Sequence, residues 1–220
     1  MKLPARVCHE APMRTALLTL CVFALAACPD PAKDKTKATV TPAKEAVATD
    51  VAPLANAVRY PFSQADSKVG FVGAKVTGKH EGGFKTFAGV LEVVEGDVTK
   101  SRVRADLDVA SLFTDSAKLD GHLKSPDFFA ADQFPQARFL SSSFKKLEGN
   151  RVDVTGALTL HGVTKTISFP ADLTLTVDQV DVKAEFALNR KDFGIVYPGK
   201  PDDLIADNVL LTLEVHAKKP

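Results

Sequence analysis

The sequence predicts an all-β fold, an eight-stranded antiparallel barrel with a short helical insertion. Apolar residues recur with a period of two rather than 3.6 through most of the chain. Each such stretch is apolar on one face and polar on the other, which is typical of an antiparallel sheet with one face in water. Turn signals such as His161-Gly162 separate the stretches.

Eight segments carry this strand pattern. In the clearest, residues 151–160, Val152, Val154 and Leu158 share one face while Asp153 lies on the other. The first two segments are strand-like but alternate less regularly. In chain order the predicted strands are residues 68–77, 84–95, 102–109, 138–146, 151–160, 166–177, 181–191 and 207–216.

An amphipathic one-layer sheet must fold over or close on itself to bury its apolar face, and closure also removes exposed edges. Eight strands is about the number at which a closed barrel holds one ligand. Residues 120–131 break the pattern with Leu123, Phe128 and Phe129, which predicts one or two helical turns over one barrel end. Small inward residues predict space inside the barrel: Ala105, Gly156, Ala171 and Ala184.

The composition is that of an ordinary globular protein and argues against a nucleic-acid partner. The 220 residues are 45% hydrophobic and 25% charged, with 28 basic and 27 acidic side chains. Such a balance lacks the basic footprint that phosphate backbones require. With 14 Phe, two Tyr and no Trp, nearly all aromatic side chains lack a hydrogen-bonding group and suit a dry interior.

Residues 1–27 are predicted to be a lipoprotein signal peptide. Arg14 precedes an apolar run from residue 16 to 27, which is shorter than the roughly 20 residues of a spanning helix. The Leu-Ala-Ala-Cys sequence of residues 25–28 resembles the bacterial lipobox, whose cysteine is acylated and becomes the first residue after cleavage. We therefore expect Cys28 to be a lipidation site, with the membrane as a partner and the protein anchored in the cell envelope facing the periplasm.

Residues 28–57 are predicted to form a disordered linker between this anchor and a folded domain at residues 58–218. From Pro29 to Ala57 the chain consists largely of Pro, Ala, Lys, Thr, Asp and Val, and holds no aromatic residue. Such a segment buries too little apolar area to offset the entropy lost on ordering.

Several short motifs of the folded domain together resemble the YceI-like, polyisoprenoid-binding domain family. Each is weak alone, but they occur in the family's order over nearly all of residues 62–217. The motifs are Gly-Gly-Phe and Phe-Ala-Gly at 82–84 and 87–89, Asp-Gly-His-Leu-Lys-Ser at 120–125 with Asp-Phe-Phe at 127–129, Phe-Pro-Gln-Ala-Arg-Phe at 134–139 with Ser-Ser at 141–142, Gly-Ala-Leu-Thr-Leu-His-Gly-Val-Thr-Lys at 156–165, and Arg-Lys-Asp-Phe-Gly at 190–194.

The resemblance implies an extended lipocalin-like barrel that holds a long isoprenoid chain or a related amphiphile without a cofactor. It places His80 and His122 near the polar end of the ligand, although each could instead satisfy a buried backbone carbonyl. Arg190 is in register with inward residues and needs a partner, either a carboxylate such as Asp120 or Asp192 or a ligand headgroup. The expected apolar lining is Phe71, Phe84, Val103, Leu107, Phe128, Phe139, Leu158, Leu160, Phe169, Leu173, Ala184, Phe186, Leu188 and Phe193.

Enzyme and metal motifs are not coherent in this sequence, so we expect no catalytic residue and no metal site. All three cysteines lie in the first 28 residues, which leaves the domain without a thiolate ligand. No histidine pair has i, i+4 spacing. The Asp-Phe-Gly at 192–194 lacks every other kinase element. His216 falls on the polar face of its strand, where we expect it to be solvated.

Two functions from different classes remain open on the sequence. The first is a non-catalytic carrier or buffer for an isoprenoid quinone or polyprenol-like lipid. The second is a structural or stress-protective envelope lipoprotein that acts through protein contacts, with its barrel filled by its own side chains. The sequence also leaves a homodimer open.

Overall fold

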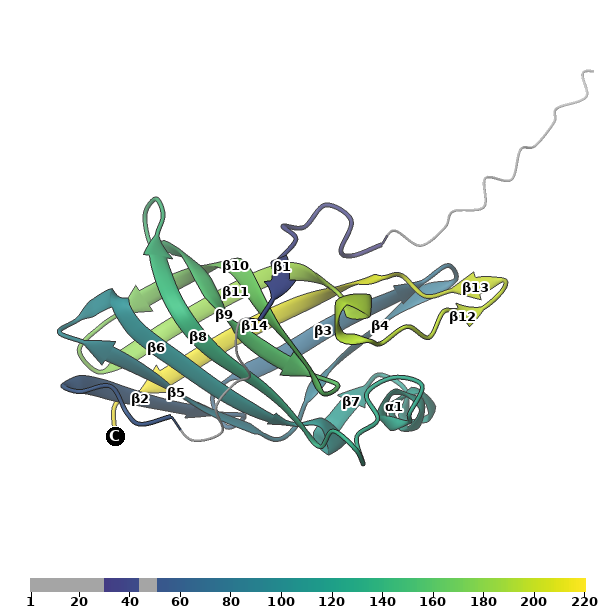
Figure 1. Ribbon diagram of the computed structural model, residues 1–220, viewed down its shortest axis with the longest axis horizontal. Coiled ribbons are helices and arrows are strands. Elements are labelled where there is room, and N and C mark those ends of the chain that lie inside the picture. The colour runs from purple at the N-terminus through teal and green to yellow at the C-terminus, as the bar shows by residue number, and fades with distance from the viewer. Residues whose placement is uncertain (1–29, 44–50) are drawn as a thin grey trace, which may run out of the picture.

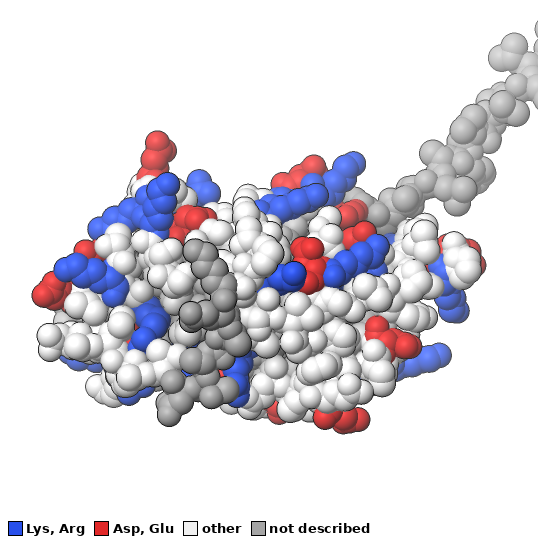
Figure 2. All heavy atoms as spheres, viewed as in Figure 1, with Lys and Arg blue, Asp and Glu red and all other residues white. Residues whose placement is uncertain are grey.

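A computed structural model describes residues 30–43 and 51–220. The predicted signal peptide and the lipidation site Cys28 lie outside these residues. The described chain is an all-β structure with one short α-helix, elongated along its strands (Figure 1). On the face seen in Figure 2, acidic and basic side chains are interspersed, in keeping with the balanced composition.

The strands are β1 (Thr39–Pro42), β2 (Ala57–Ser63), β3 (Lys68–Lys75), β4 (Gly78–Phe84), β5 (Phe87–Val94), β6 (Asp97–Asp108), β7 (Leu112–Thr114), β8 (Gln136–Lys146), β9 (Arg151–Leu160), β10 (Val163–Leu175), β11 (Gln179–Asn189), β12 (Gly199–Lys200), β13 (Asp203–Leu204) and β14 (Asn208–Lys218). The helix is α1 (Ala117–Lys124), and two 3₁₀ turns are η1 (Val109–Ser111) and η2 (Arg190–Phe193).

One antiparallel sheet curls into a half-barrel. Its hydrogen-bonded path of eleven strands runs β2-β5-β6-β8-β9-β10-β11-β14-β3-β4-β7, and β1 pairs with β10 beside this path. The curl brings β2 into contact with β14, and no ladder joins these two strands within the described ranges. Strands β12 and β13 form a separate two-stranded hairpin.

All eight predicted segments are strands, but the predicted count of eight is wrong. The structure adds β1, β2, β4, β7, β12 and β13. Strand β2 contains Pro61, which is tolerated because β2 pairs with β5 alone and lies at the end of the path. Strand β4 is rich in glycine, and β7, β12 and β13 have only two or three residues, too few to show a period.

The helical insertion is confirmed, although it starts earlier than predicted. Helix α1 begins at Ala117, and turns follow at residues 126–129. Asp120 fixes the helix to β7, because its Oδ1 accepts hydrogen bonds of 2.6 Å from both the backbone N–H and the hydroxyl of Thr114. Leu123 and Phe128 are buried against one end of the sheet.

Disorder was predicted for residues 28–57, and this is wrong for 30–43. Ala32 is fully buried against Ala187 and Leu210, and β1 forms a ladder with β10. Composition alone predicted disorder because few residues of this segment are apolar. A short strand needs only a few apolar side chains, however, when the rest of the sheet supplies the core. Ala38 and Val40 provide these and pack against the main hydrophobic cluster.

Candidate functional site

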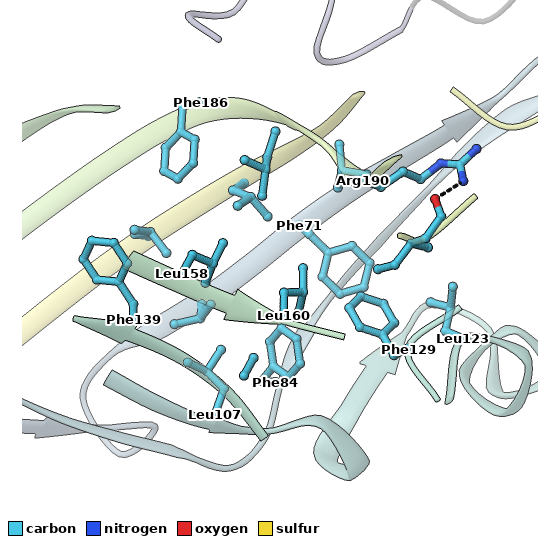
Figure 3. A pocket seen from close by; sticks show the side chains of 18 of the residues that line it. Phe71, Phe84, Leu107, Leu123, Phe129, Phe139, Leu158, Leu160, Phe186 and Arg190 are labelled. Carbon is cyan, nitrogen blue, oxygen red and sulfur yellow. Dashed lines mark hydrogen bonds between the residues drawn. The ribbon is translucent and has the colours of Figure 1, made fainter. Parts of the chain in front are cut away.

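An apolar cavity of about 490 Å³ lies inside the curled sheet (Figure 3). Side chains from most strands of the path line it, and Leu119, His122 and Leu123 of α1 close one side. Apolar residues at its inner end are almost fully buried, whereas His80 and His122 at the other end remain well exposed. The cavity therefore opens to solvent at the end formed by β3, β4, α1 and the β12–β13 hairpin, which we call the mouth.

Most of the predicted apolar lining faces this cavity, because the period-two register was read correctly. The predicted residues on its wall are Phe71, Phe84, Val103, Leu107, Phe128, Phe139, Leu158, Leu160, Phe169, Phe186 and Leu188. Further residues on the cavity wall were not included in the predicted lining, among them Phe62, Leu91, Val154, Ile167 and Leu211. The same alternation would have found most of these, whereas Phe129, Tyr197 and Ile205 lie in segments without a period.

Three predicted lining residues do not reach the cavity. Leu173 and Ala184 are buried in the main core cluster, where the sheet is packed with side chains. Phe193 is completely buried in η2, and its carbonyl accepts a hydrogen bond of 3.1 Å from His161 Nδ1. Inward register alone does not separate a side chain that lines a void from one that fills the core.

The small residues do not create the space that the sequence predicted. A Cβ at Gly156 would lie 2.5 Å from Phe139 Cζ, so the Phe139 ring already occupies that position. The same arrangement holds at Gly82, where a Cβ would lie 2.5 Å from Phe71 Cζ. Ala171 and Ala184 belong to the packed core, and of the four small residues Ala105 alone lines the cavity. The glycines let phenylalanine rings lie flat on the sheet.

Arg190 points inward, as its register predicted, but its partners are mostly backbone carbonyls. Its Nη1 donates to the Ile195 carbonyl at 2.7 Å, its Nε to Ala206 at 3.1 Å and its Nη2 to Ile205 at 3.4 Å. The Asp207 carboxylate lies 3.7 Å away, so neither Asp120 nor Asp192 is the partner. Burial lowers the pKa of Arg190, and Asp207 partly offsets this. The guanidinium holds the segment 195–207 in place beside the mouth.

Both predicted polar-end histidines lie at the mouth, and each is already paired with a carboxylate. His80 Nδ1 is 2.7 Å from Asp115 Oδ1, and this hydrogen bond holds the pKa of Asp115 below its usual value. His122 Nε2 is 3.1 Å from Asp127 Oδ2. The His122 ring also packs edge-on against Tyr197, with centroids 5.1 Å apart. Among the described residues neither histidine bonds a buried carbonyl, the alternative that the sequence left open.

The β12–β13 hairpin forms the remaining side of the mouth. Lys75 donates to Asp203 at 2.5 Å, and Asp203 also accepts from the Thr77 N–H and hydroxyl. The hydrogen bond from Lys75, followed by those from Thr77, lowers the pKa of the Asp203 carboxyl. Lys75 and Asp203 are thus paired with each other, whereas Lys200, which also lines the cavity, forms no ion pair within the described residues.

The inner end of the cavity is lined by aromatic rings. Phe169 and Phe186 stack with their centroids 4.2 Å apart and their planes 15° apart, and Phe139 packs against Phe169 at 5.8 Å. Figure 3 shows Phe139 and Phe186 at the far end of the cavity from Arg190.

The other histidines have structural partners. His161 bonds the Phe193 carbonyl, and His216 lies 2.6 Å from Asp181, so the prediction that His216 is merely solvated is wrong. Within the described residues, no group of three or more His, Cys, Asp or Glu side chains is placed to hold a metal ion. None of the helices in this part of the chain combines the length and apolar character needed to cross a membrane.

The curled antiparallel sheet around an apolar cavity places the protein in the lipocalin-like class of folds. Residues 60–217 match the model of the YceI-like domain, and the chain therefore belongs to this family. The resemblance inferred from the motifs is confirmed. A UPF0312 protein of Pseudomonas putida is 36% identical over 124 residues, which cover 54% of this chain and 65% of that protein. Protein YceI of Salmonella arizonae is 38% identical over 120 residues, 52% of this chain and 62% of that one.

Solved structures share the fold. BcnA of Burkholderia cenocepacia is 25% identical with a TM-score of 0.65, and the match covers 71% of this chain and 99% of BcnA. A polyisoprenoid binding domain from Saccharophagus degradans, implicated in plant cell wall breakdown, has a TM-score of 0.60 at 16% identity. That match covers 74% of this chain and 99% of the domain. At 16% identity the likeness concerns the fold alone.

Proposed function

We propose that the protein binds a long-chain isoprenoid or related amphiphilic lipid in the cavity and acts as a carrier or buffer without catalysis. The observation that carries this proposal is a cavity of about 490 Å³ with an almost wholly apolar wall. This volume falls within the range of about 300–1,000 Å³ typical of small-molecule sites. The shared fold of a domain described as polyisoprenoid binding supports the same ligand class.

Burial of the tail would supply the affinity. Each isoprene unit of five carbons contributes roughly 4 kcal/mol at about 0.8 kcal/mol per carbon removed from water. Three units, roughly 12 kcal/mol in total, would offset most of the range of roughly 4–15 kcal/mol given for the cost of association. Because tail burial favours many lipids alike, selectivity has to come from chain shape and from contacts at the mouth.

The charges at the mouth favour a neutral headgroup such as a quinone or a polyprenol. Arg190 is satisfied by carbonyls, Lys75 is paired with Asp203, and His122 is paired with Asp127. An anionic headgroup at Lys75 or His122 would have to displace a carboxylate, whereas a neutral hydroxyl or carbonyl could bond at the rim without breaking a pair. Within the described residues, Lys200 also lines the cavity and forms no ion pair, so it is the cation on this wall that an anionic headgroup could meet without displacing a carboxylate.

Mass spectrometry of organic extracts from the natively purified protein tests this proposal directly. Gly73 offers a sharp variant, since it lines the cavity and a Cβ there would meet no atom within 4 Å. Gly73→Phe should place a ring in ligand space from a position where the added Cβ is free, and should lower lipid affinity about tenfold or more, equivalent to ~1.4 kcal/mol. Gly121→Phe is the matched control, because Gly121 is exposed on α1 and its added Cβ is equally free.

Equal lipid content in both glycine variants would rule out the cavity as the binding site. Extracts that hold no lipid, from a protein that also fails to bind added isoprenoid, would favour a structural envelope role through protein contacts.

We further propose that Cys28 carries a lipid anchor that holds the protein to a membrane of the cell envelope, facing the periplasm. Two or three acyl chains anchor stably, whereas one holds only marginally. Cys28→Ala should release the protein from membrane fractions or leave it uncleaved. Unchanged processing and partitioning of this variant would disprove lipidation.

A further inference from the structure

The wall of the half-barrel has a slot between β10 and β11. These neighbouring strands pair with each other only at residues 172–175 and 180–183, next to their connecting turn. Beyond this point β10 continues along β9 and β11 continues along β14, each in a long ladder. The backbone edges of β10 at 163–171 and of β11 at 184–189 therefore diverge, which leaves unpaired edges facing the slot.

Residues 36–42 fill this slot from outside the family domain. Strand β1 pairs antiparallel with residues 165–168 of β10. On the other side, the Ala38 N–H donates to the Ala187 carbonyl and the Ala187 N–H donates to the Thr36 carbonyl, both at 2.9 Å. The YceI-like match begins at residue 60, so the inserted strand is an addition to the matched domain (Figure 1).

The slot lies directly over the inner end of the cavity. Val40 is the register partner of Ile167, which lines the cavity, and both Ala38 and Val40 pack against the main core. Beneath them, Phe169 of β10 and Phe186 of β11 stack across the divergence and also line the cavity. The seal therefore has two layers, a backbone layer of residues 36–42 and an inner layer formed by the Phe169–Phe186 stack.

The backbone layer is weakly held compared with the neighbouring wall. The β1–β10 ladder has four residue pairs, against ten between β10 and β9 and eleven between β11 and β14. Outside the ladder, Lys35 forms an exposed ion pair with Glu185 and Ala32 packs on Ala187. Segments with short ladders and few buried side chains open locally at lower free energy than the rest of a fold.

We propose that the slot between β10 and β11 is a side entrance to the cavity and that residues 36–42 are a displaceable strand that closes it. Lipid enters and leaves at the inner end when this strand detaches and the Phe169–Phe186 stack separates. This inference rests on the proposed lipid binding, but it concerns the route of exchange rather than the existence of the site.

A disulfide across the seal tests the route. The full chain carries Thr39→Cys and Ser168→Cys, which are register partners, with Cys8, Cys21 and Cys28 replaced by serine. A fluorescent neutral farnesyl ester is exchanged between vesicles and the protein. Oxidation should slow uptake and release together by about tenfold or more, leave Kd within about twofold, and be reversed by dithiothreitol.

The matched control is Thr159→Cys with Thr164→Cys in the same background, which crosslinks β9 to β10 beside the slot without crossing it. Equal exchange rates in the oxidised forms of both proteins would overturn the side entrance and leave lipid binding intact. Failure of the reduced proteins to bind the ester at equilibrium would overturn the proposed function, and this inference with it.

Hydrogen exchange of single amides gives a second test without any substitution. The Ala38 and Ala187 amides should exchange at least tenfold faster than amides of the β9–β10 ladder, because they are protected by the strand that detaches. Exchange of these two amides only at the rate of global unfolding would show that the strand does not open and would overturn the proposal.

Discussion

At the inner end of the cavity Phe169 stacks on Phe186 among side chains that are almost fully buried, whereas at the mouth Lys75 pairs with Asp203 and His122 with Asp127 in contact with solvent. The inner end is stabilised by packing, which any substitution that changes volume will disturb. The mouth is stabilised by exposed ion pairs and hydrogen bonds, which are individually weak. Stability should therefore respond to changes at the inner end and ligand selectivity to changes at the mouth.

Arg190 is the exception that tests this division, because it lies on the mouth side and yet is buried. Arg190→Met should lower the free energy of unfolding by about 3 kcal/mol or more, since each buried carbonyl left unpaired costs about 1–3 kcal/mol. Urea unfolding monitored by circular dichroism measures the loss. Lys191→Met, which removes an exposed partner of the same Asp207, should cost no more than about 1 kcal/mol. Equal losses of unfolding free energy in the two variants would show that the Arg190 guanidinium does not hold the segment 195–207 in place.

A bulky substitution at each end sharpens the same contrast. Ala184→Phe overfills a packed core and should cost about 1–3 kcal/mol. Gly73→Phe enters open space at the mouth and should change the free energy of unfolding within about 1 kcal/mol. Thermal unfolding of delipidated samples compares the two. If Ala184→Phe left the free energy of unfolding unchanged, the cavity would have to extend as far as Ala184.

How far the sequence could predict these two ends differs for a physical reason. The inner end is built from long strands whose alternation fixes which side chains point inward, so the inward direction of Phe139, Phe169 and Phe186 could be predicted. Whether an inward residue lines space or fills it depends on neighbours across the sheet, as Gly156 beneath the Phe139 ring shows. Such pairs depend on the register between strands, which one strand's pattern does not contain.

The mouth was harder to predict because tertiary contacts build it from irregular segments. The inward direction of Arg190 followed from its strand register, but its carbonyl partners lie in the segment 195–207, which has no periodicity. The strand at residues 39–42 was missed for a different reason. Apolar and polar residues alternate in Ala38, Thr39, Val40 and Thr41. Four residues are too few to establish a strand period in a segment whose composition is typical of disorder.

Acid should loosen the mouth before the inner end. The pKa of Asp203 is lowered in the folded protein, so the unfolded chain binds this proton at a higher pH than the native chain does. The stabilisation by Asp203 is therefore complete above the usual aspartate pKa of about 3.9 and is lost as the pH falls through the lowered value. The Val76 and Ile205 amides tie the hairpin to β3 and to its own loop, and their protection against hydrogen exchange, relative to the intrinsic rate at each pH, should fall below about pH 4.

Lys75→Met supplies the control for this acid effect, because it removes the first cause of the Asp203 shift. The variant should show a shallower fall in stability between pH 6 and 3 than the unmodified chain in urea titrations. Asp115 titrates in the same direction and remains in both proteins, so the difference between the two curves reports on Asp203. Curves that run parallel over this range would exclude the Lys75–Asp203 pair as a determinant of the mouth.

The smallest expected effect on stability is at His122, where the division between the two ends is tested most directly. Its ring is partly exposed, bonds one exposed carboxylate and packs edge-on against Phe128 and Tyr197, so His122→Ala should cost no more than about 1 kcal/mol. Because the same ring lies on the rim where a headgroup would rest, the variant should change the ratio of affinities for a polyprenol and a quinone of equal tail length. Competition between these two lipids measures that ratio, and His161→Ala, whose ring bonds the Phe193 carbonyl away from the cavity wall, is the control that should leave it unchanged. An affinity ratio that shifts equally in both variants would mean that His122 has no specific part in headgroup selectivity. A hydrolytic or transferase activity that either substitution abolished without unfolding would contradict a non-catalytic role.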